Sequence, residues 1–231
     1  MELFEKLPLT ETLARALEIV TPLGTVTSCA TVDGFTLTSR NSTHFYSLES
    51  GGLAARWELS NGVAELIMAQ PSLIPQYREQ ITDCWAVLWR FKVLSPIEKL
   101  VFKSVWLEKY DWHKGMAPNS GQWLDARTWD DGEFEVSLAT EGDDALFARS
   151  KANKWLPLRY MQESEDYEFL ALVRYLEEGM VVDFGKVSVN ETFQAHFAVA
   201  WAPYNENSVG TWLAVDLNAA EIIEGALAHI E

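Results

Sequence analysis

The sequence predicts an α+β protein in which hairpins build an antiparallel sheet, together with a helical hairpin and two further packed helices. Three observations support this class. Short β-rich runs flank glycine-containing turns, a central stretch changes to the 3.6-residue spacing of a helix, and strand runs and helix runs are segregated. Segregation favours α+β over a fold in which strands and helices alternate. With 231 residues and 48% apolar residues, the chain can bury a sizeable core.

The N-terminal part predicts one short helix followed by a β-meander. Thr10 is suited to cap a helix over residues 11–20. An antiparallel meander of about five strands should then fill residues 24–70. Its turns contain Asp33-Gly34 and Asn61-Gly62, which favour the positive φ angles of tight hairpins. The expected strands cover residues 25–32, 35–38, 44–48, 54–59 and 63–69.

The central part predicts a helical hairpin over residues 76–92 and 97–110. In the first segment the apolar residues recur at helical spacing: Tyr77, Ile81, Cys84, Leu88 and Phe91. The second segment opens with Ser95-Pro96-Ile97-Glu98, a capping box with proline at the first helical position. A very short turn separates the two, which is typical of antiparallel helix pairs.

The C-terminal part predicts a second antiparallel β region and two helices. The expected strands cover residues 124–129, 133–139, 155–160, 180–189, 192–201 and 211–217. Residues 124–129 and 133–139 should form a hairpin around Asp130-Asp131-Gly132, and residues 180–189 and 192–201 another around Asn190-Glu191. The helices are expected over residues 164–179 and from Asn218 onward, each after a residue suited to capping. We expect one domain over residues 1–231. The prolines of residues 71–75 mark the best place for a subdivision into a β-meander (1–70) and the remainder (76–231).

Charge and tryptophan are distributed unevenly along this acidic, tryptophan-rich chain. The formal net charge is −16, which repels nucleic acid and anionic membranes at long range. Residues 78–129 are the exception, because they hold eight Lys and Arg against six Asp and Glu, and six of the ten tryptophans. That combination indicates a contact surface more than a reaction centre.

Known chemical motifs are absent from the sequence. It has no phosphate-binding glycine loop and no nucleophile elbow, and its four histidines are isolated. Cys29 and Cys84 lie within apolar patterns and are expected to be buried free thiols. We therefore predict no catalytic residues, no metal site, no cofactor and no enzymatic activity. With no secretory signal and no long apolar run, the expected location is the cytoplasm, without a membrane.

Three groups of residues leave alternatives open. Asp111 and His113 could reach one ligand or metal, or could simply end a helix. His196 could be a general base or a surface or satisfied histidine, and the second is favoured. Glu133 and Glu135 could form a carboxylate pair, but alternation with apolar neighbours suggests that they face water.

One face of the second expected helix is the candidate partner-binding site. Lys99, Lys103, Trp106 and Tyr110 are spaced by four, three and four residues, which places them on one stripe of a helix. Trp112 and His113 extend this face. Packing of Trp106 within the chain is an equally good alternative. Aromatic and cationic groups could stack on bases and meet phosphates, but the acidic residues 130–231 oppose nucleic acid, so a protein partner is favoured.

The N-terminal part resembles a known family. The order Leu7-Pro8-Leu9-Thr10 into a helix, the Val26–Thr38 hairpin, Ala55-Arg56-Trp57-Glu58-Leu59 and Ala64-Glu65-Leu66 carry the resemblance. Over about residues 7–70 they resemble the small accessory subunit of type III-D CRISPR effector complexes. The resemblance implies a non-catalytic subunit held by protein contacts in an RNA-guided assembly, and it carries over no functional residue.

The function predicted from the sequence is a non-enzymatic interaction protein, an accessory subunit or adaptor in a multi-subunit complex. Nucleic acid would be contacted only locally or through partners. One alternative is a small-ligand-binding protein or enzyme with an aromatic-lined pocket. Another is an acidic mimic of nucleic acid, which predicts that the carboxylates of residues 130–231 line up on one surface.

Overall fold

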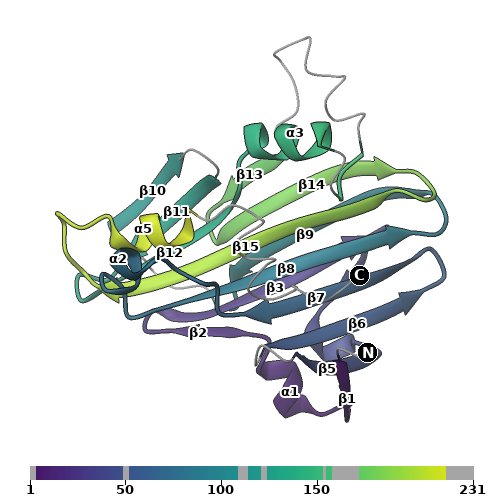
Figure 1. The fold of residues 1–231 in the computed structure, drawn as a ribbon, viewed down its shortest axis with the longest axis horizontal. Coiled ribbons are helices and arrows are strands. Elements are labelled where there is room, and N and C mark those ends of the chain that lie inside the picture. The colour runs from purple at the N-terminus through teal and green to yellow at the C-terminus, as the bar shows by residue number, and fades with distance from the viewer. Residues whose placement is uncertain are drawn as a thin grey trace.

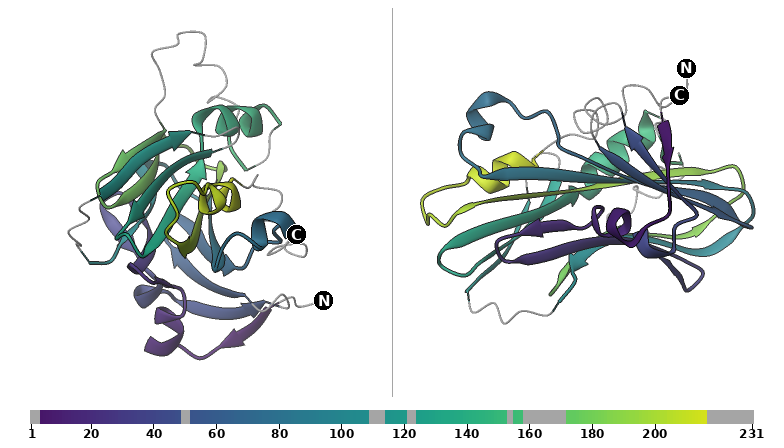
Figure 2. Two further views of the ribbon diagram at one scale, coloured as in Figure 1. Left: turned by 90° about the vertical axis from the view of Figure 1, so that its left-hand side faces the viewer. Right: turned by 90° about the horizontal axis from the view of Figure 1, so that it is seen from below.

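Two antiparallel sheets pack face to face and enclose a shared aromatic core (Figure 1). The computed structural model describes residues 4–48, 52–108, 114–120, 124–152, 155–157 and 172–216, and for 114–120 the backbone only. The two layers are seen edge-on in the right-hand view of Figure 2. The α+β class with a mostly antiparallel sheet is confirmed.

The large sheet has nine strands among the described residues, in the order β1-β5-β6-β7-β8-β15-β12-β11-β10. Its strands are β1 (Phe4–Leu7), β5 (His44–Leu48), β6 (Leu53–Leu59), β7 (Gly62–Ala69), β8 (Asp83–Val93), β15 (Thr192–Pro203), β12 (Phe134–Glu141), β11 (Leu124–Asp130) and β10 (Lys114–Ser120). The small sheet follows the order β13-β14-β9-β3-β2, with β4 paired to β3. Its strands are β13 (Val173–Leu176), β14 (Gly179–Val187), β9 (Ile97–Trp106), β3 (Gly24–Val32), β2 (Ile19–Thr21) and β4 (Phe35–Leu37).

The helical segments of the described residues are short: α1 (Glu11–Arg15), the 3-10 turn η1 (Ser39–Asn41), α2 (Pro75–Arg78), α3 (Asp143–Lys151) and α5 (Gly210–Val215). Three of them, α2, α3 and α5, lie beside the large sheet (Figure 1). Small side chains on the outer face of the large sheet let α5 approach closely, and they form a cluster with Ala214 and Val215: Ala126, Ala139, Ala198 and Ala200. No helix within the described ranges is long and apolar enough to cross a membrane.

Side chains alternate between the two faces of each strand, and those that point inward form the core. On β15 the inward positions are apolar and buried: Phe193, Ala195, Phe197, Val199 and Trp201. Trp89 on β8 stacks on Phe102 of β9 with ring centroids 5.7 Å apart, and lies 5.2 Å from the ring of Trp57. Aromatic contacts between the two sheets therefore fix their spacing.

Several local predictions are confirmed. Asp33 and Gly34 adopt φ angles of 49° and 85° in the turn between β3 and β4, as a type I′ turn requires. The hairpins β6–β7 and β11–β12 also form. The Oγ1 atom of Thr10 accepts a hydrogen bond from the Leu13 amide (3.2 Å), although the helix ends at Arg15 instead of residue 20.

Both cysteines are free and buried, as expected.

The predicted helical hairpin is wrong. Residues 83–93 and 97–106 are the strands β8 and β9, and only Pro75–Arg78 of the first segment is helical. β8 is buried on both faces, with Cys84, Ala86 and Leu88 on one face and Trp89 on the other. A strand that is apolar on both faces contains residues at every spacing, including that of a helix, so periodicity alone cannot separate the two.

Two expected strand pairings are also wrong. β14 and β15 follow each other around Asn190 but lie in different sheets, so residues 180–189 and 192–201 do not form a hairpin. The expected meander divides in the same way, because β3 and β4 belong to the small sheet whereas β5, β6 and β7 belong to the large one. On either side of residues 71–75, β7 and β8 pair with each other.

Several predictions for the C-terminal part are wrong. Within the expected helix over 164–179, residues 173–176 are the strand β13. The expected strand over 211–217 is instead the helix α5. Residues 155–157 of the expected strand 155–160 are not in a strand. The remaining parts of these segments and the helix from Asn218 lie outside the described residues.

Candidate functional site

The structure separates the residues of the predicted partner face. On a strand, side chains alternate between the two faces, so Lys99 and Lys103 lie on the face of β9 opposite to Trp106. Trp106 is 5% exposed and packs edge-on against Trp129, with ring centroids 5.4 Å apart. Lys99 reaches the carboxylate of Asp183 at 3.6 Å on the outer face of the small sheet. A helical stripe therefore does not exist here, and Trp106 belongs to the core.

Three further residues of that face, Tyr110, Trp112 and His113, lie outside the described residues, as does Asp111 of the open ligand-or-helix-end alternative.

A line of polar side chains crosses the outer face of the large sheet instead. The strand register places five residues directly opposite one another on β5, β6, β7, β8 and β15: His44, Arg56, Glu65, Arg90 and Gln194. We call this set the polar row. Its five side chains share one face because opposed residues on neighbouring strands point to the same side of a sheet. The neighbouring line of opposed residues on the same face is apolar in its middle, at Ala54, Ile67 and Leu88, and has Tyr46 at one end and His196 at the other.

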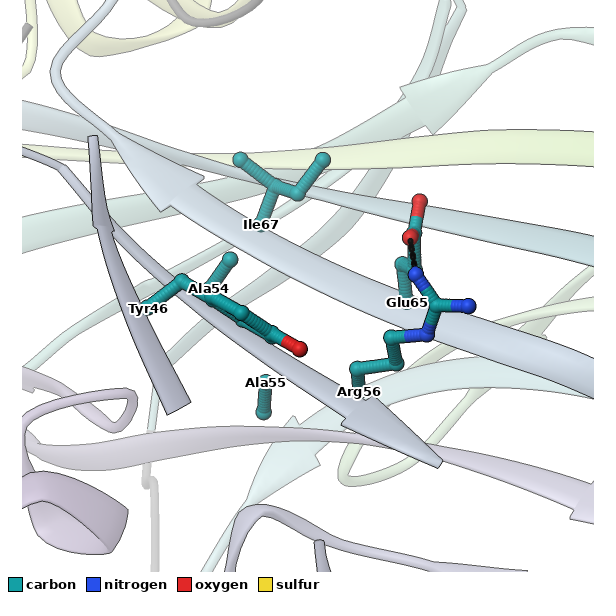
Figure 3. Close-up of a pocket in the computed structure, with 6 residues that line it drawn as sticks. All are labelled: Tyr46, Ala54, Ala55, Arg56, Glu65 and Ile67. Carbon is teal, nitrogen blue, oxygen red and sulfur yellow. Dashed lines mark hydrogen bonds and ion pairs between the residues drawn. The ribbon is translucent and has the colours of Figure 1, made fainter. Parts of the chain in front are cut away.

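A small pocket opens beside the polar row, with room for about 90 Å³. Its lining residues come from β5, β6 and β7: Tyr46, Ala54, Ala55, Arg56, Glu65 and Ile67. Figure 3 shows Arg56 and Glu65 pointing toward each other at one end, with Tyr46, Ala54 and Ile67 toward the other. The Arg56 guanidinium lies 3.5 Å from Glu65 and 3.6 Å from Glu58. The pocket thus combines an apolar floor with a half-exposed ion pair.

Arg90 occupies an unusual position in the polar row. It is only 5% exposed, its Nε atom donates to Gln194 Oε1 (3.1 Å), and its guanidinium lies over the ring of Trp155, 4.5 Å from the centroid. Burial lowers the pKa of Arg90, and the charge of Glu65 opposes that shift. The pKa of an arginine starts so high that the side chain stays charged. Arg90 is therefore a buried cation.

A second buried group lies next to the polar row and consists of Glu141, Arg149 and His196. We call it the buried clamp. Arg149, carried by α3, donates to both carboxylate oxygens of Glu141 at 2.9 Å, and His196 Nδ1 lies 3.6 Å from Glu141 Oε2. Burial by itself would raise the pKa of Glu141, but the charges of Arg149 and His196 and the hydrogen bonds from Arg149 outweigh it and lower the pKa to about 2. The clamp therefore holds a stable carboxylate–guanidinium pair between α3 and the sheet.

Arg149 also connects the clamp to Arg90. It donates to the backbone oxygen of Trp155 (3.1 Å) and to the backbone oxygen of Gln194. These are the two residues that contact the guanidinium of Arg90. The clamp thus holds in position the two residues, Gln194 and Trp155, that contact the guanidinium of Arg90.

Most of this site is not predicted from the sequence. For His196 the sequence favours a surface or satisfied histidine over a general base, and the surface alternative is wrong because the side chain is 1% exposed and lies beside the carboxylate of Glu141. Glu135, expected in water, is half-buried and accepts a hydrogen bond from Thr211, while Glu133 is exposed as predicted. The one local signal for Arg90 was a single arginine inside the apolar run of β8.

Among the described residues, no group of three or more His, Cys, Asp or Glu side chains could hold a metal ion.

No family model and no curated protein matches this chain. Among solved structures, the fold is similar to a protein described as a kojibiose phosphorylase from human microbiome, with a TM-score of 0.47 and 8% sequence identity. The match covers 86% of this chain and 26% of the other, so this chain spans about a quarter of that protein.

Proposed function

We propose that this protein is a non-catalytic binding protein, an accessory subunit or adaptor, that recognises a protein partner through the outer face of its large sheet. The observation that carries the proposal is the pocket beside the polar row, because its size and lining suit one side chain of a partner.

The volume of the pocket argues for a side chain over a whole ligand. Pockets for drug-sized small molecules enclose about 300–1,000 Å³. The pocket here has room for about 90 Å³, or roughly three water molecules at ~30 Å³ each. A single anchoring side chain of a docked protein fits that space, whereas a nucleotide or disaccharide does not.

The lining has the composition of an interface hot spot. Tyrosine and arginine are enriched where binding energy concentrates, around apolar recesses that exclude water. Tyr46 and Arg56 flank such a recess, floored by Ala54 and Ile67. Arg56 keeps 37% of its side-chain area exposed, so it can contact a partner while Glu65 and Glu58 hold it in position.

The other two functions draw less support. The pocket beside the polar row is too small to be the aromatic-lined ligand pocket of the first alternative. A nucleic-acid mimic would need its carboxylates on one surface, but Glu141 is paired beneath α3 on the large sheet and Asp183 is paired with Arg174 on the small one. The resemblance of residues 7–70 to the small accessory subunit of type III-D CRISPR effector complexes makes an RNA-guided assembly the first partner to test.

Site-specific photo-crosslinking tests the proposal. A photoreactive amino acid replaces Glu58, which is exposed beside Arg56, and a matched control replaces Glu11, an exposed residue of α1. We expect one stoichiometric partner to be captured from position 58 and not from position 11. The variant R56A should weaken binding of the purified partner about tenfold or more, since hot-spot residues contribute at least that much. Equal capture at both positions, or unchanged affinity in R56A, would count against the proposal.

A further inference from the structure

We infer that Arg90 is the receptor for a single carboxylate, bound at the free edge of its guanidinium on the outer face of the large sheet. The inference goes beyond the proposed function, because it assigns a chemical group to Arg90 and not to the pocket beside Arg56. It also stands if no protein partner docks at that pocket.

The first argument is the missing counter-ion. No carboxylate of the described residues lies within 4.0 Å of Arg90, although the residue is 5% exposed. Arg149 shows what this chain does elsewhere, because its side chain is 9% exposed and holds Glu141 at 2.9 Å with two donors. Removing a cation from water without a partner is costly, so buried charges in proteins are normally paired. An anion supplied from outside would complete the pair.

The second argument is the geometry of the unused donors. The Nε edge of Arg90 is occupied by Gln194, and one face of the guanidinium is covered by Trp155. Neither Nη1 nor Nη2 has a hydrogen-bond partner among the described residues, and neither is fully closed off from solvent. The Nη1–Nη2 edge presents two parallel donors, which match the two oxygens of a carboxylate.

The third argument is preorganisation. Arg149 holds the backbone oxygens of Gln194 and Trp155, the two residues that contact Arg90. The guanidinium therefore does not need to be ordered when the anion arrives, which lowers the entropic cost of binding.

Charge decides between a carboxylate and a phosphate. Arg56 is paired with both Glu65 and Glu58, so Arg90 is the one cation of the polar row without a carboxylate partner among the described residues. One negative charge neutralises it. A phosphate dianion would add excess negative charge to a chain with a net charge of −16.

Glu65 is the alternative partner for Arg90 within the chain. Register places their Cβ atoms about 5 Å apart. The carboxylate of Glu65 nevertheless turns to Arg56 at 3.5 Å and comes within ion-pair distance of Arg90 at no atom. If Arg90 served only to pack on Trp155, methionine should replace it without loss of any binding property.

Titration of the wild-type protein with acetate tests the inference directly. The side-chain Nε–Hε signal of Arg90, assigned by its loss in R90M, is followed by NMR at constant ionic strength with chloride as the balancing anion. We expect a saturable shift of the Arg90 signal in acetate, without a comparable shift of the exposed Arg15. A signal that moves no more than that of Arg15 would overturn the inference.

Thermal unfolding supplies the matched comparison. Acetate should raise the Tm of the wild type and of R15Q but not that of R90M, and the affinity of R90M for acetate should fall about tenfold or more. An equal rise in R90M would overturn the inference. Saturable binding of phosphate tighter than that of acetate would overturn the assignment to a carboxylate. Y46A alters the partner pocket but leaves the Arg56–Glu65 pair and the Arg90 guanidinium in place, so acetate binding should be unchanged in Y46A, which separates this inference from the proposed partner pocket.

Discussion

Replacing Glu141 with glutamine should remove the anionic half of the buried clamp while keeping the size of the side chain. Glu141 is 4% exposed, and its pKa is lowered from 4.5 to about 2. Removing one partner of a buried ion pair costs about 3–5 kcal/mol in general. We therefore expect E141Q to lower the free energy of unfolding by about 3 kcal/mol at pH 7.

The effect should depend on pH in a defined direction. Because the pKa of Glu141 is lower in the folded state than in the unfolded state, the unfolded state takes up the proton first as pH falls. The stabilisation is fully present above about pH 4.5 and is lost as the pH falls toward 2. The difference between wild type and E141Q should shrink over that same window, since protonated glutamate and glutamine are then alike.

Urea unfolding followed by tryptophan fluorescence at a series of pH values measures both quantities. The matched control is E11Q, because Glu11 and Arg15 form an ion pair whose side chains are 70% and 64% exposed. E11Q should unfold like the wild type at each pH. A loss below about 1 kcal/mol in E141Q at pH 7, or a loss that does not change down to pH 2, would refute the account of the clamp.

Three further predictions concern the core and the turns. W89A, which empties a fully buried site between the two sheets, should lower the free energy of unfolding by about 3–5 kcal/mol in urea titrations. G62A should lower the Tm more than G34A, because a Cβ atom at Gly62 would lie 2.3 Å from Phe91 Cε1, whereas Gly34 has only its φ of +85° to accommodate; equal Tm values would contradict this. Cys84, whose thiol pKa is raised by burial and by the charge of Asp83, should react with a thiol reagent only after unfolding, and fast labelling of the native protein would disprove its burial.

Turns were the most predictable part of the fold because their chemistry is local. Asp33-Gly34 needs positive φ at both positions, and the two residues tolerate it wherever they occur. Asn190 also adopts positive φ, at 67°, in the turn expected between residues 180–189 and 192–201. Its flanking strands nevertheless enter different sheets. A turn sequence indicates that the chain reverses, whereas the choice of pairing partner depends on which core face each strand must cover.

The candidate site could not be predicted for a related reason. Arg90 and Gln194 are 104 positions apart, and only the register of β8 with β15 places them opposite each other. The clamp combines residues of β12, α3 and β15 in the same way. To predict the site, β8 must first be recognised as a strand, but its sequence predicts a helix because both of its faces are apolar.

The tryptophan-rich stretch now has a structural explanation. Among the described residues, β8 is the fifth of nine strands in the large sheet and β9 is the central strand in the order of the small one, so one connected segment supplies the middle of both layers. Central strands bury the most area, which accounts for the large rings of Trp89 and Trp106 on the inner faces. The positive charge of the same segment is carried on the outer faces, by Lys99 and Lys103 on one sheet and by Arg90 and Lys92 on the other. Lys99 is exposed and paired with Asp183, whereas Arg90 is buried without a carboxylate among the described residues. Of these two outer faces, the one with Arg90 therefore has the stronger reason to bind something.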